Sequence, residues 1–99
     1  MSKGFSILGI NEHLQQGLTD LQISVPTDIQ KKTIPVVLNH KEDVVVLAKT
    51  GSGKTAAFGL PLLQLINIQN TNIQALILAP TRELGQQIYN NLAAFAMNL

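Results

Sequence analysis

One stretch limits what this chain can fold into more than any other: Ala48-Lys49-Thr50-Gly51-Ser52-Gly53-Lys54-Thr55. It follows an apolar run at residues 44–47 and leads into the small and apolar residues 56–58. A buried strand, a glycine-bearing turn and a helix start form the context that a phosphate-binding loop requires. Gly51 and Gly53 lack side chains, so the backbone can curl there and point successive N–H groups at an anion.

The last two side chains of this stretch supply further groups for chemistry. Lys54 can reach the β and γ phosphates of a nucleoside triphosphate, and the Thr55 hydroxyl can coordinate Mg²⁺. The strict pattern has glycine where Ala48 stands, so one alternative is a loop whose glycines serve only a tight turn. The intact Gly-Lys-Thr and its strand-to-helix context favour binding of a nucleoside triphosphate. Lys54 and Thr55 are the candidate catalytic residues.

Composition excludes several classes of protein. A chain of 99 residues forms at most one small domain, which here is the whole of residues 1–99. The net charge of +1 does not indicate a dedicated nucleic-acid module. No apolar run approaches the ~20 residues of a membrane span. The absence of cysteine fits the reducing environment of the cytoplasm, which is the expected location.

Apolar periodicity and turn signals predict an alternation of helices and strands. The predicted elements are a helix over residues 12–21 that Asn11 caps, a helix over 27–38, a strand over 44–48, a helix over 54–68, a strand over 75–79, and a final helix that Thr81 caps. Two strands joined by a helical crossover indicate a parallel α/β unit. Pro35 and Pro61 are expected to bend their helices.

Two further stretches carry a resemblance to a known family: Pro26-Thr27-Asp28-Ile29-Gln30 and Pro80-Thr81-Arg82-Glu83-Leu84-Gly85-Gln86-Gln87. With the glycine-bearing stretch between them, they resemble the Q motif, motif I and motif Ia of a DEAD-box RNA helicase. Alanine is what this family has at the position of Ala48. The resemblance implies an α/β fold, a partial RecA-like domain of the P-loop NTPases with parallel strands and flanking helices. It also implies ATP and Mg²⁺ as cofactors and RNA as the partner.

The resemblance assigns roles to individual residues. ATP binding is assigned to Phe5, Thr27, Gln30, Ala48, Lys49, Thr50, Gly51, Ser52, Gly53, Lys54 and Thr55. Phe5 would stack on the adenine, Gln30 would read its edge, and Thr27 would tie this segment to the phosphate loop. The RNA backbone would be contacted, at a helix N-terminus, by Pro80, Thr81 and Arg82.

Most of these roles have a purely structural alternative. Thr27 and Gln30 are spaced as a capping box, in which each side chain satisfies the backbone N–H of the other residue. Phe5, taken alone, is more often a core residue than a platform for a base. Arg82, beside Glu83, could belong to an ordinary solvated helix start.

Residues 1–99 do not contain the Asp-Glu-Ala-Asp segment of the family, and the only acid after the glycine-bearing stretch is Glu83. Hydrolysis needs a carboxylate that holds Mg²⁺ and positions water, so this piece is not expected to turn over ATP by itself. Strands that separate the two predicted ones in the family would also be missing. We therefore expect an incomplete sheet, whose free edges favour self-association.

Two other functions stay open. One is a phosphate-loop ATPase or kinase that does not act on RNA, and the other is a non-catalytic nucleotide-binding module.

Overall fold

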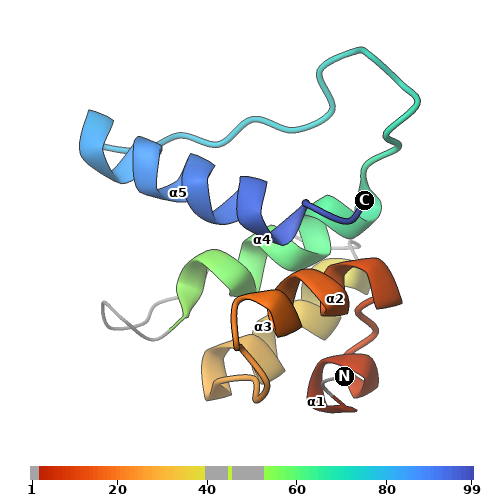
Figure 1. The fold of residues 1–99 in the computed structure, drawn as a ribbon. Coiled ribbons are helices and arrows are strands. Elements are labelled where there is room, and N and C mark those ends of the chain that lie inside the picture. The colour runs from red at the N-terminus through yellow and green to blue at the C-terminus, as the bar shows by residue number, and fades with distance from the viewer. Residues whose placement is uncertain (1–2, 40–44, 46–52) are drawn as a thin grey trace.

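The structure is a computed structural model that describes residues 3–39, 45 and 53–99. These residues contain helices and no strand: α1 (Lys3–Ile7), α2 (Glu12–Asp20), α3 (Asp28–Asn39), α4 (Lys54–Leu65) and α5 (Arg82–Phe95). α4 packs against both α3 and α5, and α2 packs against α1 and α5 (Figure 1). In this part of the chain, no helix has both the length and the apolar character needed to cross a bilayer.

The helix predicted over residues 12–21 is confirmed as α2. Asn11 Oδ1 accepts a hydrogen bond of 2.9 Å from the Leu14 N–H, which satisfies one of the free donors at the helix start. Leu14 and Leu18 lie one turn apart on the same face and are fully buried. Leu21, which we expected to continue this stripe, follows the last helical residue and is 42% exposed.

The core is built from side chains of all five helices and of the turn after α1. Its buried members are Phe5, Ile10, Leu14, Leu18, Ile34, Ala56, Leu60 and Phe95. Fully burying a side chain such as Leu60 contributes ~1.5–3 kcal/mol to folding.

The two predicted helices that contain a proline are confirmed, with small changes at their ends. α3 starts and ends one residue later than predicted, and α4 ends at Leu65 rather than at residue 68. Pro35 and Pro61 lie inside continuous helices. Pro61 is fully buried, so its packing offsets part of the cost of the backbone hydrogen bond that its ring removes. The bend at each proline stays a prediction.

The strand predicted over residues 75–79 is not confirmed by this structure. The segment from α4 to α5 forms no strand and runs outside the helical body (Figure 1). Ile73, Leu76 and Leu78 on this segment are 91%, 80% and 84% exposed. A strand exists through hydrogen bonds to a neighbouring strand, and no described residue supplies one. The other predicted strand, over 44–48, lies outside the described residues except for Val45, which is 87% exposed.

Candidate nucleotide-binding site

The first turn of α4 has no side-chain cap, in contrast to α2 and α5. Asn11 and Thr81 cap those two helices with side-chain oxygens, whereas Gly53 precedes α4 at φ 87° and ψ 26°. This left-handed conformation favours glycine, because a Cβ would crowd the backbone. The first N–H groups of any α-helix have no partner within the helix. Among the described residues, no side chain caps these groups at α4, and the helix dipole favours an anion at this position.

Thr27 and Gln30 form the capping box at the start of α3. The Thr27 N–H donates to Gln30 Oε1 at 2.9 Å, and the Gln30 N–H donates to Thr27 Oγ1 at 3.4 Å. The structural alternative from the sequence is therefore confirmed for this pair. It does not exclude a second role for either side chain.

The side chain of Gln30 also joins α3 to the start of α4. Its Nε2 donates to the Gly53 carbonyl oxygen at 3.2 Å. Thr27 Oγ1 lies close by, at 3.1 Å from the position that a Cβ on Gly53 would occupy. A carboxamide carries two N–H donors and an oxygen with two lone pairs. After its bonds to Thr27 and Gly53, the Gln30 side chain keeps one donor and one acceptor for a ligand.

A cavity of about 640 Å³ opens beside these groups. Its lining comes from the segment after α2, the starts of α3 and α4, and one face of α5: Leu21, Ile23, Gln30, Gly53, Lys54, Thr55, Ala56, Leu84, Asn91 and Phe95. Lys54 is exposed and Thr55 is half-buried. The structure thus brings together four residues assigned to ATP binding at one hollow of a size typical for ligand sites. The loop residues Ala48, Lys49, Thr50, Gly51 and Ser52 lie outside the described residues.

The assignment of Phe5 as a base-stacking residue is not supported by this structure. Its ring is 0% exposed and belongs to the hydrophobic core. Stacking requires one free face of the ring, and burial among Leu14, Leu18 and other apolar side chains leaves none. The alternative left open by the sequence, a core residue, is the one observed.

The residues assigned to RNA contact lie at the start of α5, and none of them lines the 640 Å³ cavity, although Leu84 in the same helix does. Thr81 caps this helix as predicted, and its Oγ1 accepts a hydrogen bond of 3.1 Å from the Leu84 N–H. Pro80, Thr81 and Arg82 are all exposed. Arg82 also lines a shallow polar hollow of about 460 Å³ along α5.

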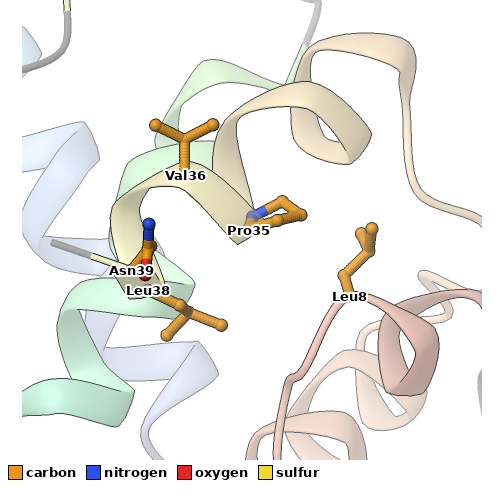
Figure 2. Close-up of a pocket in the computed structure, with 5 residues that line it drawn as sticks. All are labelled: Leu8, Pro35, Val36, Leu38 and Asn39. Carbon is orange, nitrogen blue, oxygen red and sulfur yellow. The ribbon is translucent and has the colours of Figure 1, made fainter. Parts of the chain in front are cut away.

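Another hollow, of about 560 Å³, lies between the turn after α1 and the second half of α3. Figure 2 shows Leu8 facing Pro35 and Leu38 across it. None of the residues that line it belongs to the predicted site, so it does not extend the candidate nucleotide-binding site.

An uncapped glycine start of a helix, followed by lysine and threonine, is the arrangement of a phosphate-binding-loop protein. The family model of the DEAD/DEAH box helicases matches residues 27–99, and the chain belongs to this family. It is 43% identical over 88 residues to the DEAD-box ATP-dependent RNA helicase CshA of Geobacillus kaustophilus, which covers 89% of this chain and 19% of that protein.

Solved structures show the same relationship. A DEAD box protein from the hyperthermophile Methanococcus jannaschii is similar with a TM-score of 0.88 and 40% identity, over 94% of this chain and 25% of that one. S. cerevisiae Dbp5 bound to RNA and ADP BeF3 is similar with a TM-score of 0.93 and 30% identity, over 99% of this chain and 25% of that one. The chain therefore spans about a quarter or less of the length of these relatives.

Proposed function

We propose that residues 1–99 form the ATP-binding part of a DEAD-box RNA helicase, which couples ATP binding and hydrolysis to RNA unwinding or remodelling. The observation that carries the proposal is the bond from Gln30 Nε2 to the Gly53 carbonyl oxygen. This bond supports the proposal because it holds a carboxamide, which could read a base, beside the first turn of α4, whose N–H groups could hold phosphates. Family membership favours this function over a kinase or a non-catalytic binding module.

Within this proposal, residues 48–55 wrap the phosphates and Lys54 neutralises part of their charge. The described residues contain no group of three or more histidines or acids that could hold a metal ion. Mg²⁺ fits the site in the usual way for a nucleotide, because this ion is bound largely through phosphate oxygens and water. The Thr55 hydroxyl is its protein ligand from this chain. Hydrolysis requires a carboxylate that holds Mg²⁺ and positions water. Glu83, the only acid after the loop within residues 1–99, lies instead in the first turn of α5, beside the residues proposed to contact RNA.

The proposal also accounts for the exposed apolar segment between α4 and α5. In a RecA-like domain, residues 44–48 and 75–79 would be parallel strands that pair with strands from the rest of the protein. Such strands are buried on both faces, which fits the apolar side chains of Leu76, Ile77 and Leu78. Residues 1–99 alone would leave these edges open, and we expect them to self-associate.

Replacing Gln30 separates base reading from helix capping. A capping box accepts glutamate as well as glutamine, so Gln30→Glu keeps an acceptor for the Thr27 N–H. Glutamate at neutral pH has no donor for N7 of adenine. N7 is common to adenine and guanine, and the carboxylate of glutamate still accepts from N6 of adenine. We therefore expect Gln30→Ala to abolish the preference of the full-length protein for ATP over GTP, and Gln30→Glu to bind both nucleotides more weakly while it keeps that preference. Isothermal titration calorimetry with both nucleotides and Mg²⁺ measures this preference.

Capping and base reading give different results in this experiment. If Gln30 serves only in capping, Gln30→Ala would weaken ATP and GTP binding equally and leave the ratio of the two affinities unchanged. Gln15→Glu is a matched control, because Gln15 is also a buried glutamine that donates to a backbone carbonyl, that of Ile10. We expect this control to keep the ratio of the two affinities even where it lowers stability.

RNA contact by the start of α5 has its own test. Arg82 is exposed at the first position of a helix whose N-terminus favours phosphate. Arg82→Ala is expected to weaken binding of single-stranded RNA uniformly across sequences and to reduce the salt slope by about 1, because one phosphate contact is lost. Fluorescence anisotropy at several salt concentrations measures both quantities. Lys32→Ala, at an exposed lysine on α3, is the control and should keep the wild-type slope. If the salt slope of Arg82→Ala also equalled that of the wild type, the proposal would be contradicted.

A further inference from the structure

We propose that Gln64 is a positioning residue for base recognition. Gln64 on α4 fixes the position of the turn after α1. Helix α1 packs against Pro26 and so fixes the position of the segment that carries Gln30. The inference rests on the proposed function, because it concerns how Gln30 is held relative to the phosphate site.

Gln64 bridges α4 to the turn between α1 and α2. Its Oε1 accepts from the Asn11 N–H at 2.7 Å, and its Nε2 donates to the Gly9 carbonyl oxygen at 2.6 Å. Both polar ends of one carboxamide are thus used on backbone groups that flank Ile10, a core residue. A side chain that donates and accepts at once fixes the orientation of this turn, whereas a group with only one function would leave it free to rotate.

The other end of α1 packs directly against the segment before Gln30. A Cβ on Gly4 would lie 2.6 Å from Pro26 Cδ and 3.1 Å from Pro26 Cγ, so only glycine permits this approach. Pro26 is buried and directly precedes Thr27, whose N–H is bound by the Gln30 side chain. Phe5, adjacent to Gly4, anchors α1 in the core.

These contacts connect Gln64, near the end of α4, to Gly53, the residue directly before α4, by way of α1 and α3. From Gln64 the path of contacts passes through the turn at Gly9 and along α1 to Pro26. From there it passes through Gln30 to Gly53, directly before α4. A shift of α1 would therefore move the Gln30 carboxamide relative to Gly53. The distance between the base-reading group and the phosphate site is thus set partly by Gln64, which lines none of the 640 Å³ cavity.

The test measures the dissociation constants of ATP and GTP, with Mg²⁺, for the full-length protein. Gln64→Leu removes both hydrogen bonds at nearly constant size, and Gln64→Glu keeps the acceptor for Asn11 but loses the donor to Gly9. Gln16→Leu is the matched control, since Gln16 is exposed and its side chain donates to Asp20 within α2. A variant that is partly unfolded weakens the apparent binding of ATP and GTP by the same factor, because both nucleotides bind only the folded protein. The ratio of the two dissociation constants therefore does not depend on the folded fraction.

We expect Gln64→Leu to lower the preference for ATP over GTP about three- to tenfold, as for other residues that act through a chain of contacts. Gln64→Glu should lower it less, and Gln16→Leu should not change it. If Gln64→Leu does not fold, Gly4→Ala displaces α1 from its other end and should lower the same ratio. An unchanged ratio in the Gln64 and Gly4 variants would overturn the inference.

The same titrations separate this inference from the proposed function. A wild-type protein that binds ATP and GTP equally would overturn both. A wild-type preference for ATP that Gln30→Ala abolishes and Gln64→Leu preserves would leave the proposed function intact and reject only the role of Gln64.

Discussion

Lys54→Ala in the full-length protein is expected to lower the affinity for ATP and for GTP alike by about a hundredfold. The estimate takes the lower end of the range for two charge-assisted hydrogen bonds to phosphates, ~1.5 kcal/mol each, because 1.4 kcal/mol corresponds to about tenfold in affinity. Lys54 is exposed at the first position of α4, where its ammonium group adds to the free N–H groups of the helix start. Calorimetric titration with each nucleotide in the presence of Mg²⁺ measures the loss.

Equal losses for the two nucleotides distinguish Lys54 from Gln30, because phosphates are common to ATP and GTP whereas the purine edge is not. Lys32→Ala is the matched control, since Lys32 is an exposed lysine on α3 outside the cavity. Should Lys54→Ala bind ATP as tightly as the control does, the phosphate site would not lie at the start of α4.

Gly53→Ala is expected to reduce both stability and ATP affinity. A φ of 87° costs an alanine ~1–2 kcal/mol, because its Cβ crowds the following carbonyl. The new Cβ would also meet Gln30 Nε2 at less than any real contact distance, so the bond from Gln30 to the Gly53 carbonyl cannot persist unchanged. We expect the free energy of unfolding to fall by about 2–3 kcal/mol. ATP affinity should fall at least tenfold, because the loop loses its contact with α3.

Gly85→Ala is the control for this substitution. Gly85 lies inside α5 with only Ala79 Cβ near, at 3.8 Å, and alanine favours a helix by ~1 kcal/mol over glycine. Urea unfolding should therefore show opposite shifts for the two variants. A Gly53→Ala protein as stable as the wild type would contradict the role of the left-handed conformation at α4.

Local features of the fold could be predicted from the sequence, because the interacting groups lie within one helical turn of each other. Asn11 and Thr81 each bind an N–H three residues ahead, and Thr27 pairs with Gln30 at the same spacing. Apolar periodicity also located α2, α3, α4 and α5 to within a few residues. The same short-range logic identified Gly53, Lys54 and Thr55 at a helix start.

Residue types at short, fixed spacings were enough to predict α2, α3, α4 and α5, the side-chain caps and the family, whereas α1 was not predicted. Tertiary structure alone decided the rest. It buried Phe5, left residues 75–79 unpaired, and made Gln64 a partner of Gly9 across a separation of 55 residues. A side chain's distant partners depend on how the helices pack, and a strand depends on a neighbour that accepts its backbone hydrogen bonds. Neither condition can be read from the spacing of residues along the chain.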